Sequence, residues 1–324
     1  MKKLILKSIS LLVVAIMAVP VQVHAQDWPN KSIRFISPFA PGGSNDIATR
    51  VIAEKLSQKL VQPIVVENKP GANTRIASDL IAKSDPDGYN FLMVAAPHTT
   101  NPALYGKLPY DTLQDFTHIV QVVRAPLFLI VPANSPYTNV KQFLDASVKQ
   151  EIGFNVSSPG NGTAPHLALE VLNYIAKANL NHIPYKGDAP AVTDVLGGRV
   201  EAGIHPIVAP LPQIQSGRIR VLAVFGDHRS GLLPDVPSMG ELGYPDTGVY
   251  TWFGLVGPAK LPADMVNRLN RDINDILAQP EVTARFVALG METVGGTSPK
   301  FTDFVRADID KWKDLVTKRN IRPD

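Results

Sequence analysis

Apolar segments of two different periodicities alternate along almost the whole chain, and this alternation restricts the fold more than any other feature. Short runs rich in Val, Ile and Phe are typical of buried strands, and each precedes a segment with apolar residues three or four positions apart, as on one side of a helix. Strands are expected over residues 33–37, 63–67 and 89–95, with helices over 45–60 and 75–83. This order predicts parallel strands with helices on both faces of the sheet.

A second series of the same kind begins near residue 127, and three amphipathic helices follow it. Its expected strands span residues 127–131, 152–156, 181–184, 200–204 and 220–225. The expected helices span residues 140–149, 163–177, 189–196, 263–277, 280–289 and 299–316. The Pro- and Gly-rich span 233–248 is typical of irregular chain. A chain of this length usually divides into lobes. We therefore expect an α/β fold of two domains, each a doubly wound mixed sheet flanked by helices, with a cleft between them.

The first 25 residues have the three parts of a secretory signal peptide. Lys2, Lys3 and Lys7 form a basic start, an apolar core covers residues 9–19, and "VHA" supplies small residues for cleavage after Ala25. A membrane-anchoring helix is the alternative, but the core is about half of the ~20 apolar residues that a span requires. We expect export to the periplasm as a soluble protein.

Removal of this segment leaves a mature chain without net charge. Three of the 32 basic residues and none of the 29 acidic ones lie in it, so 29 of each sign remain. A neutral chain gives no reason to expect nucleic acid or an anionic membrane as partner. The chain contains no cysteine, which excludes disulfides, thiolate chemistry and cysteine-based metal sites. We expect a monomer without metal or cofactor.

The loop "PFAPGGSND" after the first strand carries groups that could meet an anion. Ligands of doubly wound sheets bind beyond the carboxyl ends of the strands, where unpaired N–H groups of helix starts carry partial positive charge. Gly42 and Gly43 lack side chains, so a ligand could approach these amides closely, and Ser44 or Asn45 could cap the helix. Asp46 could instead fill the amides with its own carboxylate, and a plain turn remains the alternative.

Two further polar loops follow strands, "SSPGNGTAPH" at residues 157–166 and "APHTTNP" at residues 96–102. The first opens a helix in the other half of the chain and offers many donors with little bulk. It does not fit a dinucleotide fingerprint, because Pro165 stands where a third glycine belongs. His166 has no second histidine beside it in this segment, which favours a structural role for it. Anion-accepting helix starts in both halves of an exported chain predict a cleft that closes on a small acid.

The chain resembles the Bug family, the substrate-binding proteins of tripartite tricarboxylate transporters, over essentially the whole mature sequence. The resemblance rests on "WPNKSIRFISPFAPGGSNDIATR", "VVENKPGA", "DPDGYNFL", "NPALYGKLPYDT", "GNGTAPHLALEVL", "IPYKGDAPAVTDVLGGRVEAG", "IQSGRIRVLAV", "LPDVPSMGELGYP" and "WFGLVGPA".

This resemblance implies a Venus-flytrap fold whose hinge the chain crosses twice, with residues 26–123 plus 253–324 in one domain and 124–252 in the other. It implies a carboxylate ligand, such as a di- or tricarboxylate, an amino acid or an aromatic acid, held partly through water and delivered to a two-component membrane permease. The implied ligand-binding residues are Phe39, Ala40, Gly42, Gly43, Ser44, Asp46, Arg75, His98, Thr99, Ser158, Asn161, Gly162, Thr163, His166, Tyr185, Lys186 and His205.

Two positions depart from the family pattern. Arg75 replaces a small neutral residue, and His205 stands where the family often has a small polar one. Either side chain could pair with a second carboxylate if it points into the cleft. Arg75 could equally be a solvated residue at a helix start.

Two other functions are compatible with the same sequence pattern. A periplasmic hydrolase is the first, but no zinc-type histidine pair, complete G-x-S-x-G elbow or Walker lysine is present. A Ser/His pair that only the fold brings together across the cleft, such as Ser158 with His98, remains an alternative. The second is a sensor that presents its ligand to a membrane kinase. We expect a binding protein and not an enzyme.

Overall fold

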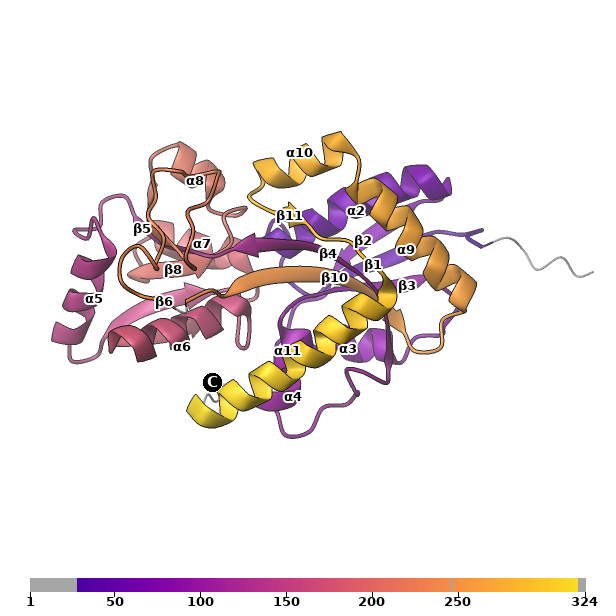
Figure 1. Ribbon diagram of the computed structural model, residues 1–324, viewed down its shortest axis with the longest axis horizontal. Helices are drawn as coiled ribbons and strands as arrows, with labels where there is room; N and C mark the ends of the chain where they lie inside the picture. Colours follow the sequence, from indigo (N-terminus) through magenta and orange to yellow (C-terminus); the bar gives the residue numbers. More distant parts are fainter. Residues whose placement is uncertain (1–27, 246, 320–324) are drawn as a thin grey trace, which may run out of the picture.

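The computed structural model describes residues 28–245 and 247–319, so the expected signal peptide lies outside the described residues. The chain forms two mixed sheets that are joined by long strands (Figure 1). The first sheet has the order β11-β4-β10-β3-β1-β2. Its strands are β1 Ile33–Ser37, β2 Ile64–Asn68, β3 Asn90–Val94, β4 Phe116–Pro126, β10 Tyr250–Pro258 and β11 Glu292–Thr293.

The second sheet has the order β7-β6-β8-β5-β9. Its strands are β5 Phe128–Pro132, β6 Phe154–Ser158, β7 Leu180–Pro184, β8 Ala202–His205 and β9 Ile219–Val224. The helices are α2 Ser44–Leu60, α3 Arg75–Ala82, α4 Pro97–Leu104, α5 Val140–Lys149, α6 Ala164–Ala176, α7 Asp188–Leu196, α8 Leu211–Gln215, α9 Ala263–Leu277, α10 Pro280–Ala288 and α11 Ser298–Arg319.

The predicted parallel β-α-β-α-β unit is confirmed for the start of the chain, since β1 pairs in parallel with both β2 and β3. The sheet is mixed because β10 returns from the second lobe and pairs antiparallel with β3 and β4. In the second sheet β6 is parallel to β7 and β8, whereas β5 is antiparallel to β8 and β9.

The chain passes twice between the two sheets. β4 leads through Leu127 directly into β5, and the irregular segment after β9 returns the chain to β10. β4 and β10 pair along their whole length, so the two crossings lie side by side and form one strap between the lobes (Figure 1). No helix within the described residues combines the length and the apolar character that crossing a bilayer requires.

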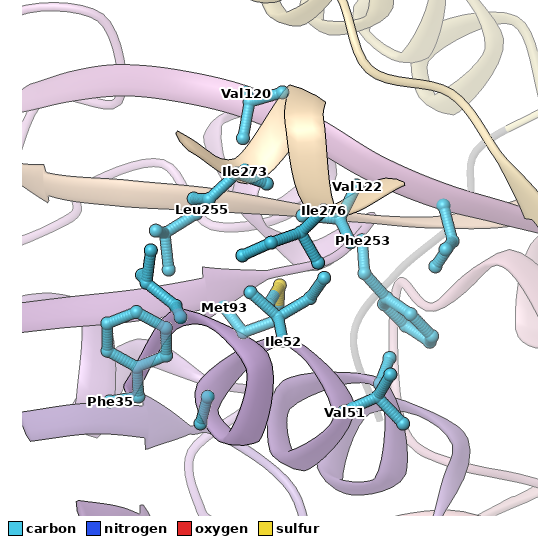
Figure 2. Close-up of a cluster of buried hydrophobic side chains, with 14 of the residues drawn as sticks. Phe35, Val51, Ile52, Met93, Val120, Val122, Phe253, Leu255, Ile273 and Ile276 are labelled. Atoms are coloured by element: carbon cyan, nitrogen blue, oxygen red, sulfur yellow. The ribbon is translucent and has the colours of Figure 1, made fainter. Parts of the chain in front are cut away.

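The core of the first lobe lies between its sheet and the helices α2 and α9. Figure 2 shows Ile52 of α2 and Ile276 of α9 directed toward Met93 and Leu255 on the strands. All four side chains are at most 1% exposed. Burial of a side chain of this size contributes about 1.5–3 kcal/mol, so the first lobe has a well-packed frame from which its loops project.

Candidate ligand site between the lobes

Within the described residues, three hydrogen bonds connect the loops that follow the strands, and the first turns of the helices after them, across the two lobes. The Ala40 amide donates to the Lys186 carbonyl at 2.8 Å. The Ser44 amide donates to Asp188 Oδ2 at 3.1 Å, and Thr100 Oγ1 donates to the Gly162 carbonyl at 2.8 Å. Each bond joins a residue of the first lobe to one of the second, so together they hold the lobes closed.

A cavity of about 20 Å³ lies between the lobes behind these contacts. It is lined by Phe39, Asn45, Ala95, Ala96, Pro97, Thr251 and Phe253 of the first lobe and by Pro159, Thr163, Ala164, Pro165, Asp188 and Pro206 of the second. The lining includes the first turns of four helices, α2, α4, α6 and α7. Helix N-termini carry partial positive charge, so the cavity suits an anion although none of its described lining residues is basic.

In the loop after β1, the Asp46 carboxylate occupies one of the amides that a ligand could use. The Gly42 amide donates to Asp46 Oδ2 at 2.9 Å, and Arg50 and Asn68 also donate to this carboxylate. Burial raises the pKa of Asp46, but the hydrogen bonds from Arg50, Gly42 and Asn68 outweigh it and leave the pKa below its usual value. Asp46 therefore stays ionised and fixes the loop from within, which leaves the amide of Ser44 for a partner from across the cavity.

The start of α2 has no side-chain cap, so the expected capping by Ser44 or Asn45 is wrong. Asn45 instead joins the loop to the sheet, because its Oδ1 accepts from Ser37 Oγ and its Nδ2 donates to the Met93 carbonyl. Ser44 Oγ is buried without a hydrogen-bond partner. The Ser44 amide therefore has its partner on the second lobe, where it donates to Asp188.

The loop after β6 is held in shape by its own polar groups. Ser158 Oγ is 2.5 Å from His182 Nε2, and Thr163 Oγ1 donates to the Gly160 carbonyl. The Gly162 amide donates to His166 Nδ1 at 3.0 Å, and the His166 ring stacks on that of His182. Of these residues only Thr163 lines the cavity, so Ser158 and His166 position the loop from behind.

Four of the expected ligand-binding residues line a separate outer pocket of about 320 Å³ instead, namely Arg75, Asn161, Tyr185 and Lys186. The Arg75 guanidinium lies 4.0 Å from the centre of the Tyr105 ring, and its Nε donates to the Ala72 carbonyl. Tyr185 donates to Asp194 at 2.7 Å. Phe39 of the first lobe and Pro159 of the second line both this pocket and the cavity, so they form the wall between them.

His98 and Thr99 lie in the first lobe behind the cavity wall. His98 Nε2 is 3.2 Å from His118 Nε2, and Thr99 Oγ1 donates to Asp308 of α11. Neither residue lines the cavity. Ser158 and His98 do not meet across the cleft, since each has another histidine as its partner.

His205 connects two residues that sequence reasoning did not single out. Its Nδ1 is 3.1 Å from Asp188 Oδ1, and its Nε2 is 3.1 Å from Ser157 Oγ. A carboxylate oxygen accepts, so Nδ1 donates to Asp188, and the Ser157 hydroxyl lies within hydrogen-bond distance of Nε2 on the other side of the ring. Ser157 is fully buried and does not line the cavity, so this chain of groups orients Asp188 and offers no exposed nucleophile.

Asp188 lines the cavity and was not singled out by sequence analysis, although the quoted "YKGDAP" contains it. The available signal was an acidic residue directly after Gly187 at a helix start. Within the described residues, no group of three or more His, Cys, Asp or Glu side chains could hold a metal ion.

Comparison with known proteins agrees with this architecture. Residues 48–321 match the model of a family described as Tripartite tricarboxylate transporter family receptor. Protein BugT of Bordetella pertussis is 36% identical over 314 residues, covering 94% of each chain. The solved structure of R. palustris Rpa4515 with adipate superposes with a TM-score of 0.89 at 30% identity, covering 92% of this chain and all of that one. MatC from Rhodopseudomonas palustris with bound malate gives a TM-score of 0.84 at 27% identity, covering 89% of this chain and all of that one.

Proposed function

The chain belongs to the tripartite tricarboxylate transporter receptor family, and on this premise we propose that it binds a small organic carboxylate between its lobes and delivers it to a two-component membrane permease. The family consists of periplasmic solute receptors and not of enzymes. Two structural neighbours carry adipate and malate. The observation that carries the proposal is the cavity onto which four helices direct their N-termini.

Binding follows from the placement of these helix starts. In the open form, the acid meets the amides at the start of α2 on the first lobe. Closure then adds Thr163 and the starts of α6 and α7 from the second lobe. Closure is driven only if the ligand binds the closed form more tightly than the open one. Each charge-assisted hydrogen bond contributes roughly 1.5–3 kcal/mol, so a few well-placed donors can offset the cost of desolvating a carboxylate.

We further propose that the domains comprise residues 26–123 plus 253–324 and residues 124–252. The separation of the strands into two sheets supports this division, since both boundaries lie within the paired strands β4 and β10. We also propose cleavage after Ala25 and action in the periplasm, in line with the family.

A calorimetric panel of small acids tests the proposal on the mature protein from Gln26 onward. Adipate, malate, tricarboxylates, amino acids and aromatic acids are titrated beside a neutral sugar. At least one acid should bind with a dissociation constant of about 10 μM or lower, which corresponds to roughly 7 kcal/mol. The acid should also be recovered unchanged. Binding of the sugar without heat from any acid would contradict the proposal.

Arg75→Ala should change the affinity for small mono- and dicarboxylates alike by less than about threefold. The reason is that the guanidinium stacks on Tyr105 in the outer pocket and does not line the cavity. Calorimetry of the variant with both classes of acid measures the effect. A loss confined to dicarboxylates would instead assign Arg75 to recognition of a second carboxylate.

A further inference from the structure

Among the described residues, a single charged side chain lines the cavity, and it is negative. Asp188 is the first residue of α7 and is 6% exposed. Its two oxygens have different partners, because Oδ2 accepts from the Ser44 amide of the first lobe and Oδ1 from His205 of its own lobe. A carboxylate thus stands in the wall of a site that is otherwise suited to anions.

The position of this carboxylate is fixed from behind. The His205 ring is fully buried and is held on its other side by Ser157. On the opposite lobe, the carboxylate packs against the start of α2, where a Cβ at Gly43 would lie 3.4 Å from Asp188 Oδ2. The carboxylate therefore stays at the cavity wall whether or not the first lobe is in contact with it.

Asp188 and a bound acid must compete for the same donor. The cavity of about 20 Å³ is close to the space of one water molecule and is smaller than any organic acid. A ligand can enter only if the lobes part, and parting breaks the bond between the Ser44 amide and Asp188, which spans them. The ligand carboxylate then takes the Ser44 amide, whereas Asp188 keeps His205 and loses one donor beside the incoming anion.

Building on the proposed function, we propose that Asp188 makes the site selective for acids that carry a positive charge or a hydrogen-bond donor next to their carboxylate, such as zwitterionic amino acids. An ammonium group would replace the donor that Asp188 loses and would form a charge-assisted hydrogen bond. A second carboxylate would instead meet a like charge in a buried place. The residue thus discriminates against di- and tricarboxylates.

Matched acids of equal chain length test this selectivity by calorimetry at pH 7. One set is 2-aminobutyrate, butyrate and succinate, and a second set is norleucine, hexanoate and adipate. The amino acid should bind at least about tenfold tighter than the dicarboxylate of its set. Asp188→Asn should reverse this order, with a loss of about tenfold for the amino acid and a gain for the dicarboxylate. Asp145→Asn on α5, which removes the same charge at an exposed position of the second lobe, should leave the order unchanged.

The outcomes separate this inference from the proposed function. Dicarboxylates that bind as tightly as amino acids, in the wild type and in Asp188→Asn, overturn the selectivity and leave a carboxylate receptor. Absence of binding by every acid overturns the proposed function itself. Asparagine can still accept from the Ser44 amide, so the variant should fold. If the melting temperature of Asp188→Asn drops strongly, the order of affinities in the wild type alone tests the selectivity.

Discussion

Replacing Gly162 by valine should weaken binding of the carboxylate ligand by about 100-fold, which corresponds to about 2.7 kcal/mol. Gly162 lies where the loop after β6 meets α4 of the first lobe. A Cβ there would lie 2.5 Å from Leu104 Cδ1 and 2.7 Å from Thr100 Oγ1. Leu104 is buried in the core and cannot move freely. The side chain would hold the lobes apart and remove the donors that closure adds, at roughly 1.5–3 kcal/mol for each charge-assisted hydrogen bond.

Gly198→Val is the matched control for this experiment. Gly198 has φ +64°, close to the +62° of Gly162, but nothing lies within 4 Å of a Cβ at Gly198. Both variants therefore carry a backbone strain of about 1–2 kcal/mol, and only Gly162→Val obstructs closure. Calorimetry gives the affinities, and small-angle scattering reports whether the liganded variant stays open. Similar affinity in both variants would show that the contact of Gly162 with α4 is not needed for binding.

The local pattern of apolar residues was sufficient to predict most of the fold. The strand expected over 33–37 is observed with these bounds, and the helix expected over 45–60 begins one residue earlier. Both have clear apolar periodicity between strong turn signals. The expected α/β fold of two lobes is confirmed for the same reason, since the alternation of strands and helices is encoded segment by segment.

The strap between the lobes was not predicted as strands. β4 places His118, Gln121 and Arg124 among its apolar residues, and β10 contains Gly254 and Gly257, so neither alternates cleanly. Both glycines have tertiary causes, because a Cβ at Gly254 would lie 2.2 Å from the Phe301 ring and one at Gly257 would lie 2.5 Å from Leu261. Pairing between strands so far apart in sequence leaves no local signal.

The helix α4 was also missed, because two prolines mark the segment as a loop. Pro97 stands in the first turn, where its missing N–H is not needed, and Pro102 lies inside the short helix.

The sequence predicted the parts of the candidate site that single loops form. It did not predict the contacts that arise only when the two lobes close. The helix starts at Ser44 and Ala164 could be read from Gly-rich loops after strands. Asp188 reaches the Ser44 amide across 144 positions of sequence, and only the closed lobes bring the two together. In the same way, no pattern indicates that His98 meets His118 and not the cavity.

This histidine pair should make the protein sensitive to acid, with a loss of about 3 kcal/mol or more in the free energy of unfolding between pH 6.5 and pH 4. Burial lowers the pKa of His118 from its ordinary value of 6.5 to about 4. Burial, together with the nearby His118, lowers the pKa of His98 as well. Between these values the unfolded chain binds protons that the folded protein does not, so stability is full above pH 6.5 and falls as the pH falls.

The slope of this loss is about 1.4 kcal/mol per pH unit for each buried histidine. Urea unfolding of the mature protein at a series of pH values measures it. His118→Gln removes one titrating group from the core and should reduce the slope by that amount. His228→Gln, at an exposed position, should leave the slope unchanged. Asp308 acts in the opposite direction, because burial raises its pKa and it takes up a proton more readily when folded. A slope that His118→Gln does not reduce would mean that this pair is not the source of the acid sensitivity.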